Sequence, residues 1–148
     1  DIMTLAKPLA GGLPIGAVLV TEAVAQIMQP GDHGSTFAAG PLVCRAAKVV
    51  FDRVCRREFL GAVAANGKYL QDRLRSLEDV RIVEVRGAGL LVGVEFSMSV
   101  KPLVAATAEK GLIVINAGEN VLRLCPPLIV TGDQIDTAID IISECLNE

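Results

Sequence analysis

The sequence has few aromatic residues, one histidine and no large excess of either charge. Aromatic residues make up only 3% of the 148 residues, and the formal net charge is −3. Nucleic-acid surfaces depend on base stacking and on a positive field, so this composition argues against nucleic acid as a partner. The same charge gives no reason to expect binding to an anionic membrane. Because His33 is the only histidine, a zinc site is also disfavoured.

No two of the four cysteines form a CxxC pair, and all four are widely spaced. Three of them stand among aliphatic residues. We therefore expect buried, unpaired thiols in a reducing compartment, in preference to disulfides or metal ligands, and we expect no metal site. The cysteines are Cys44, Cys55, Cys125 and Cys145.

No segment has the pattern of a membrane span or of a targeting peptide. Residues 2–20 are mostly apolar, but this stretch holds Lys7, two prolines and three glycines, which a lipid-exposed helix would not tolerate. The first residues lack a signal or transit pattern, and the chain opens at Asp1 without a methionine, so we expect a piece of a longer polypeptide. The hydrophobic fraction of 51% excludes disorder and leaves apolar surface for a partner subunit or for more of the same chain.

The apolar pattern predicts an α/β fold. An apolar run over 2–6 ends at Lys7 and Pro8, where proline favours an extended backbone for the lysine. The run over 15–20 does not alternate, which is typical of a strand buried on both faces of a parallel sheet. A long helix begins near Pro41. Its apolar face is made by Leu42, Ala46, Val49, Val50 and Val54.

Beyond residue 57 the pattern indicates a smaller α+β unit, so we expect two domains, residues 1–57 and residues 58–148. Thr131 and Gln134 have the spacing of a capping box at the start of the last helix. The further expected elements are helices at 22–28, 59–77, 103–110 and 135–146, and strands at 80–86, 90–96, 112–115 and 121–124.

Lys7 is the only charged residue between Asp1 and Glu22. A lysine at a buried strand end beside a glycine loop is costly to desolvate as an ammonium. Burial favours the neutral amine, which is the form that attacks a carbonyl carbon. From position alone, Lys7 is either such a reactive amine or a lysine whose side chain extends to water at the sheet edge.

Three segments resemble those of the class III (fold type I) PLP-dependent aminotransferases. The segment 4–17, TLAKPLAGGLPIGA, is similar to the family's lysine segment, in which the lysine ends a strand and glycines let backbone pass close to the cofactor. The segments 31–37, GDHGSTF, and 121–128, VLRLCPPL, resemble two further landmarks of the family. The resemblance covers essentially the whole chain. It implies the end of the large PLP-binding domain, followed by the small C-terminal α+β domain.

The resemblance implies a role for four residues. Lys7 is the catalytic lysine, which forms a Schiff base with pyridoxal 5'-phosphate (PLP). Thr36, with Ser35 beside it, binds the cofactor phosphate, usually from the neighbouring subunit, so a homodimer is expected. Neutral donors suffice for a phosphate when several converge. Arg123 recognises a substrate carboxylate, for which the guanidinium fork is suited.

Each of these segments also has a plain structural interpretation. Taken alone, residues 31–37 are a glycine turn, and Arg123 is an ion-paired arginine at a sheet edge. The segment 86–93, RGAGLLVG, lacks the glycine spacing and the following helix of a dinucleotide loop, so we interpret it as a structural hairpin. The basic residues between 45 and 57 are interpreted as a solvated helix face.

The lysine and 31–37 segments are most similar to the plant-type acetylornithine branch of the family. The implied reaction transfers an amino group from N-acetylornithine to 2-oxoglutarate, which becomes glutamate; ornithine and 4-aminobutyrate are alternative amines. The implied place is intracellular, in a plastid or mitochondrion of a plant and otherwise in the cytoplasm. A rival interpretation is a non-catalytic fragment or interaction domain, because no aspartate here has the Asp-x-Val-Gln-like context that pairs with the PLP ring nitrogen. We therefore expect the fragment alone to be inactive.

Overall fold

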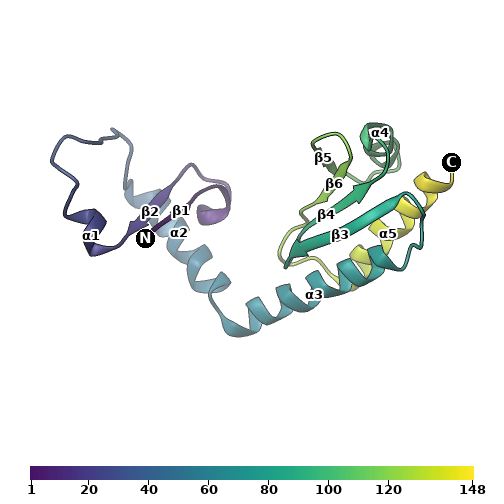
Figure 1. The fold of residues 1–148 in the computed structure, drawn as a ribbon. Helices are drawn as coiled ribbons and strands as arrows, with labels where there is room; N and C mark the ends of the chain where they lie inside the picture. Colours follow the sequence, from purple (N-terminus) through teal and green to yellow (C-terminus); the bar gives the residue numbers. More distant parts are fainter. The chain divides into compact units, whose positions relative to one another are not determined.

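The computed structural model describes all of residues 1–148. In chain order the elements are β1 (Ile2–Leu5), the 3-10 helix η1 (Lys7–Ala10), β2 (Ala17–Val20), α1 (Glu22–Ala25), α2 (Pro41–Val54), α3 (Arg57–Arg75), β3 (Ile82–Ala88), β4 (Leu91–Phe96), α4 (Lys101–Glu109), β5 (Ile115–Ala117), β6 (Val121–Leu124) and α5 (Gly132–Asn147) (Figure 1). The chain divides into unit 1, residues 1–59, and unit 2, residues 60–148.

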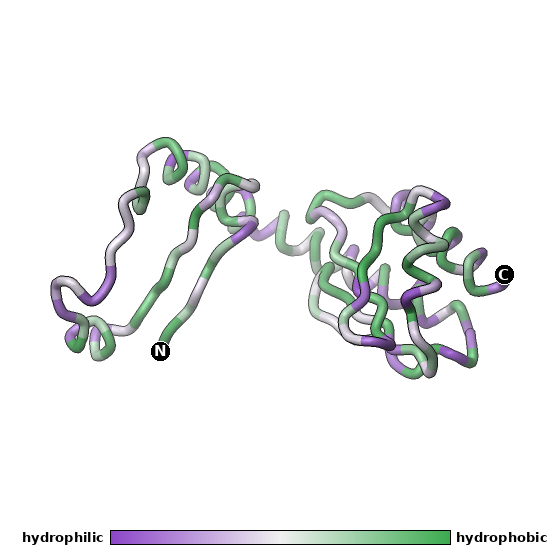
Figure 2. Tube along the Cα trace, turned by 90° about the horizontal axis from the view of Figure 1, so that it is seen from above, coloured by the Kyte–Doolittle hydropathy of each residue, from purple (hydrophilic) through white to green (hydrophobic).

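The sheet of unit 1 is an antiparallel pair, in which β1 and β2 align from Ile2 opposite Val20 to Leu5 opposite Ala17. The expected parallel sheet, buried on both faces, is therefore wrong for these two strands. Both strands are hydrophobic over most of their length (Figure 2), yet Val18 is 66% exposed and Leu19 is 49% exposed. The physical reason is that no further strand extends this two-stranded sheet within the chain.

The long helix of unit 1 starts where the sequence predicts, at Pro41 in its first turn. Its polar face is solvated, and Lys48 pairs with Asp52 at 3.1 Å. The predicted apolar face is largely unburied, because α2 packs mainly against η1, where Val50 lies beside Gly11. The helix after β2 is shorter than predicted and ends at Ala25, since residues 27 and 28 close a tighter turn with bonds to residues 24 and 25.

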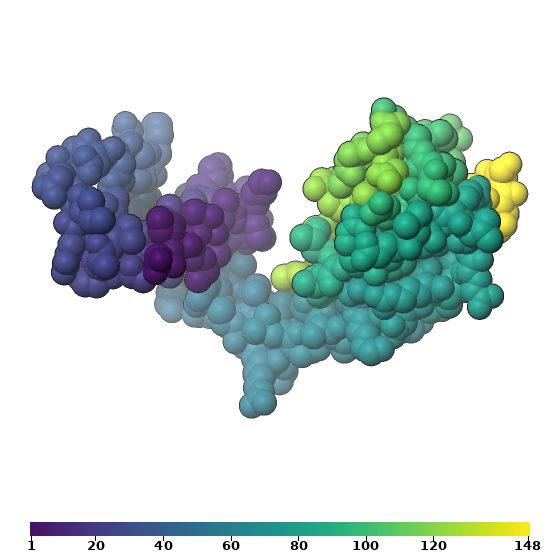
Figure 3. Space-filling view, in the orientation of Figure 1, coloured from purple at the N-terminus to yellow at the C-terminus, as the bar shows by residue number.

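Unit 2 is built on a four-stranded antiparallel sheet with the order β3-β4-β6-β5. One sheet face packs against α3 and α5 in the hydrophobic core, and the strands and helices form a continuous body (Figures 1 and 3). The opposite face is open. The fully buried core side chains include Leu70, Leu74, Val92, Val94, Phe96, Leu122, Ile135, Ile139 and Ile142.

Most predicted elements of unit 2 are confirmed with shifted ends. The strand predicted at 112–115 is displaced to β5, because the Leu112 N–H still closes the end of α4 by donating to the Thr107 carbonyl. The capping box at the start of α5 is confirmed: the Thr131 N–H donates to Gln134 Oε1 at 3.0 Å, and the Gln134 N–H donates to Thr131 Oγ1 at 3.3 Å.

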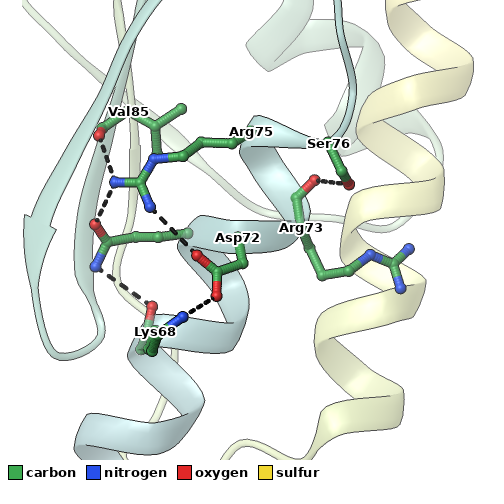
Figure 4. Close-up of polar contacts among 8 residues, drawn as sticks. Lys68, Asp72, Arg73, Arg75, Ser76 and Val85 are labelled. Carbon is green, nitrogen blue, oxygen red and sulfur yellow. Dashed lines mark hydrogen bonds and ion pairs between the residues drawn. The ribbon is translucent and has the colours of Figure 1, made fainter.

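Polar contacts join α3 to its neighbours in unit 2. The Tyr69 hydroxyl donates to Asp136 on α5 at 2.7 Å, and Arg73 pairs with the same carboxylate. At the end of α3, Arg75 donates to the Val85 carbonyl on β3 at 3.0 Å and pairs with Asp72 (Figure 4). The Lys68 hydrogen bond to Asp72 is the largest cause that lowers the pKa of this carboxyl below its ordinary value.

The glycine-rich segment 86–93 forms the β3–β4 hairpin, which confirms its structural interpretation. Its turn passes directly over α3 at Gly67. A Cβ atom at Gly67 would lie 2.7 Å from the Gly89 Cα and closer still to the Gly89 carbonyl, so only glycine fits there. Gly89 itself has a φ of +54°, a conformation that disfavours side chains.

The expectation of buried cysteines is wrong for three of the four. Cys44, Cys55 and Cys125 are exposed, Cys145 is partly buried, and all four thiols are free. Cys44 and Cys55 belong to α2 and its end, which buries no residue, and Cys125 follows the last residue of β6. No helix in the structure is both long and apolar enough to span a membrane.

Candidate active site

Lys7 is the first residue of η1, one residue beyond the extended Ala6 that follows β1. Its side chain is exposed, which differs from the expected burial. The reason is the same as for β1 and β2, since the surrounding strands are themselves largely exposed within this chain. Lys7 makes no ion pair, whereas the other lysines each pair with a carboxylate. Those lysines are Lys48, Lys68, Lys101 and Lys110.

The backbone at Lys7 is strained. Its φ is +41°, in the left-handed region that non-glycine residues rarely adopt. Such a conformation costs on the order of 1–3 kcal/mol, and it is concentrated at functional sites. Gly11 and Gly12 follow with φ values of +64° and +106°, so the loop after η1 requires glycine at both positions.

The segment 31–37 forms part of an exposed loop between α1 and α2 that presents the hydroxyls of Ser35 and Thr36. The backbone N–H groups of residues 33–37 donate to no carbonyl or side chain of the chain. Ser35 lines an open hollow of about 390 Å³ together with residues 14–16, 37–40 and 43. The loop therefore offers two hydroxyls and several free amides, a donor set suited to an anion.

No hydrogen bond or ion pair joins Lys7 to Ser35 or Thr36 within unit 1. The lining of the hollow includes Ser35 but neither Lys7 nor Thr36. At the η1 end, Gly11 contacts Val50, whereas the hollow reaches α2 at Val43. A helix rises about 1.5 Å per residue, so these two points on α2 are about 10 Å apart. Figures 1 and 2 accordingly show η1 and the loop at separate places around the β1–β2 pair.

Arg123 lies on β6 between the buried side chains of Leu122 and Leu124, and it points to the open face of the unit 2 sheet. β6 is an inner strand, paired with both β4 and β5, and Arg123 makes no ion pair. The interpretation as an ion-paired edge arginine is therefore wrong on both counts. An exposed guanidinium without a protein carboxylate is free to bind one from a ligand.

Sequence reasoning missed three charged residues on the same open face as Arg123. Arg86 on β3 donates from Nη1 to Glu84 and to Glu95, each at 2.6 Å. These hydrogen bonds, that of Glu95 first, raise the pKa of the Arg86 guanidinium above its ordinary value. The alternation of Glu84 and Arg86 with buried Val85 was the signal that could have placed them on one face.

The residues of unit 1 fit part of PLP. The unpaired Lys7 amine suits its aldehyde, and the loop with Ser35 and Thr36 suits its phosphate. For the ring nitrogen the unit offers less: Asp32 accepts a hydrogen bond from the Gln29 N–H at 2.7 Å, Asp52 pairs with Lys48, and Asp1 lies exposed at the first position of the chain. No group of three or more His, Cys, Asp or Glu side chains is placed to hold a metal ion.

Comparisons with known proteins find relatives along the whole length of the chain. The chain is 52% identical over 149 residues to the mitochondrial acetylornithine aminotransferase of Alnus glutinosa, covering 99% of this chain and 33% of the relative. It is 44% identical over 151 residues to the acetylornithine aminotransferase of Caldanaerobacter subterraneus, covering 100% of this chain and 38% of the relative. The chain thus spans between about one third and two fifths of the length of these curated relatives.

Solved structures give the same result. The acetylornithine aminotransferase of Elizabethkingia anophelis superposes with a TM-score of 0.88 at 31% identity, over 99% of this chain and 40% of that one. The ornithine aminotransferase of Toxoplasma gondii superposes with a TM-score of 0.89 at 30% identity, over 99% of this chain and 36% of that one. These neighbours have the fold of type I PLP-dependent aminotransferases, to which the chain corresponds as the C-terminal part. The family model for class-III aminotransferases matches residues 1–146, and the chain belongs to this family.

Proposed function

We propose that this chain is the C-terminal part of a PLP-dependent aminotransferase that transfers the amino group of N-acetylornithine to 2-oxoglutarate. The observation that carries the proposal is Lys7, an unpaired amine on a strained backbone inside the segment 4–17. The acetylornithine specificity is supported by relatives of that name that are up to 52% identical over almost the whole chain. Several of these relatives are named as mitochondrial, which supports an intracellular place.

Lys7 has two tasks in this proposal. Its Nζ would hold the cofactor aldehyde, and its free amine would carry a proton to and from the substrate carbon. When bound, PLP supplies the electron sink for the charge that develops at that carbon. The left-handed backbone at Lys7 fixes the direction from which the side chain leaves the β1–η1 junction.

The phosphate is held by the loop of the neighbouring subunit. Thr36 and Ser35 supply hydroxyls, and the free amides of residues 33–37 supply further donors. The separation of η1 from this loop in unit 1 supports a site shared between two chains. The exposed apolar side chains of unit 1, such as Val18 and Phe37, support further packing partners in a homodimer or in the rest of a longer polypeptide.

Arg123 pairs with a carboxylate of the substrate. The exposure of its unpaired guanidinium on the open sheet face supports this role. The partner of the ring nitrogen has to come from residues outside this chain. For this reason the 148-residue piece alone is expected to show no transaminase activity above that of free PLP.

The experiment that tests the proposal is a transaminase assay of the full-length protein with N-acetylornithine, ornithine and 4-aminobutyrate side by side, each with 2-oxoglutarate. The account predicts the largest kcat/KM for N-acetylornithine. Ornithine is the second candidate, because solved ornithine aminotransferases superpose with TM-scores of 0.89 and 0.90. A larger kcat/KM for ornithine than for N-acetylornithine would make ornithine the assigned substrate. No activity with any of the three would favour a non-catalytic protein.

A further inference from the structure

Arg123 stands in a row of residues that crosses the open face of the unit 2 sheet. Its register partners are Gly93 on β4 and Ile115 on β5, and Gly93 pairs in turn with Arg86 on β3. Gly93 has no side chain, so no side chain of this row separates Arg86 from Arg123 over β4. The Val121 side chain beside the row reaches towards Gly93, with its Cγ1 3.3 Å from the position of a Cβ atom there. The two guanidinium groups therefore share one stretch of sheet surface.

Glu95 is the carboxylate that the register places nearest to Arg123. It lies two residues from Gly93 on β4 and pairs with Val121 on β6, which makes it a diagonal neighbour of Arg123. Diagonal neighbours in an antiparallel sheet have Cα atoms about 7–8 Å apart, a separation that long side chains span. Glu84 is the register partner of Glu95 on β3 and lies one strand further away.

Neither carboxylate is paired with Arg123, and Arg86 binds both of them. Its Nη1 donates to Oε2 of Glu84 and to Oε2 of Glu95, each at 2.6 Å. The side chain of Glu95 is 31% exposed and that of Glu84 is 56% exposed, so Glu95 is the more firmly enclosed of the two. Arg123 is left as the guanidinium on this face without a carboxylate partner.

We propose that Arg86 is a positioning residue that holds Glu95 away from Arg123 and so keeps the Arg123 guanidinium free for the carboxylate of a ligand. The inference rests on the proposed role of Arg123 in binding a substrate carboxylate. Without Arg86, Glu95 becomes an internal competitor for Arg123, and a ligand carboxylate has to displace it. Exposed ion pairs of this kind are weak, so the competition weakens ligand binding about 2- to 5-fold.

The test measures the dissociation constant of glutarate, an unreactive dicarboxylate, by calorimetry on the full-length protein. We expect Arg86→Ala to raise this constant about 2- to 5-fold. Adding Glu95→Gln should restore the wild-type value, since a neutral amide does not compete for the guanidinium. The matched control is Arg86→Ala with Glu84→Gln, which has the same net charge and should stay weakened. Arg86→Lys should lie near the wild type.

The inference is overturned if Arg86→Ala binds glutarate as the wild type does. It is also overturned if Glu84→Gln restores binding as well as Glu95→Gln, because the cause is then the local net charge. If neither second substitution restores binding, Arg86 has a structural role and the inference again fails. Arg123→Leu separates this from the proposed function: an unchanged dissociation constant in that variant means that Arg123 does not bind the carboxylate at all.

Discussion

Replacing glycine by alanine should have opposite effects on stability at two positions of α3. Gly67 faces the β3–β4 turn, where an added Cβ would lie 2.7 Å from the Gly89 Cα and closer to its carbonyl. Gly61 lies in the same helix, and nothing is within 4 Å of the Cβ position. Alanine at either site gains the helix propensity that glycine lacks, which is worth about 0.5–1 kcal/mol. The contact with Gly89 is therefore the difference between them.

Gly61→Ala should stabilise the protein by that propensity alone. At Gly67 the new methyl group meets backbone atoms, which can move only if the hairpin moves away from the helix. Overpacking costs about 1–3 kcal/mol, and a contact with backbone atoms belongs to the upper half of that range, about 2–3 kcal/mol, so a net loss of about 1–2.5 kcal/mol remains after the propensity gain. The sign of the effect thus changes between two positions of one helix.

The assay is thermal unfolding of the full-length protein, followed by circular dichroism at one protein and one cofactor concentration. Gly61→Ala should unfold at or above the wild-type Tm, and Gly67→Ala should unfold below it. A Gly67→Ala variant with a Tm equal to or above that of the wild type would refute the close contact between α3 and the hairpin.

Three further predictions concern charge and assembly. Arg123→Leu should remove a charge-assisted pair worth about 1.5–3 kcal/mol and lower kcat/KM roughly 10- to 150-fold with PLP occupancy unchanged; loss of PLP instead would show a structural role. In mixed dimers of Lys7→Ala and Thr36→Val chains, activity should approach half that of the native dimer if Thr36 acts across the interface. It should not exceed half that of an impaired Thr36→Val homodimer if Thr36 acts within its own chain. The hydrogen bond from Arg81 lowers the pKa of the Asp79 carboxyl below its ordinary value of 3.8. The ionised carboxylate therefore stabilises the fold by about 1 kcal/mol above that pH, and this stabilisation is lost as the pH falls through the lowered pKa. The Tm deficit of Asp79→Asn at pH 7 should therefore vanish in acid, and a deficit independent of pH would contradict this.

Features with local causes were predictable from the sequence. The start of α2 follows from Pro41, and the start of α5 follows from the pairing of Thr131 with Gln134. The hairpin over residues 86–93 follows from its glycines and from the apolar strand after them. In each case the residues that determine the structure lie within a few positions of one another.

Features that depend on distant contacts were not predictable. The sequence of an apolar strand such as β2 does not indicate how many strands lie beside it. The exposure of β2 and its antiparallel pairing were therefore not predicted. The strand predicted at 112–115 begins only at Ile115, because the Leu112 N–H still donates to the Thr107 carbonyl at the end of α4. At the site, Arg123 was predicted from its segment. The pairing of Arg86 with Glu95 was not, because it depends on the register between β3 and β4.

The central claim is that Lys7 binds the cofactor, and borohydride reduction of the full-length protein tests it most directly. Borohydride reduces the imine between a lysine amine and the cofactor aldehyde to a stable secondary amine. Digestion followed by mass spectrometry then identifies the modified lysine. The account predicts the phosphopyridoxyl group on the peptide that contains Lys7, and none in a Lys7→Ala variant. A modified Lys48, Lys68, Lys101 or Lys110, or a lysine outside these 148 residues, would contradict the assignment.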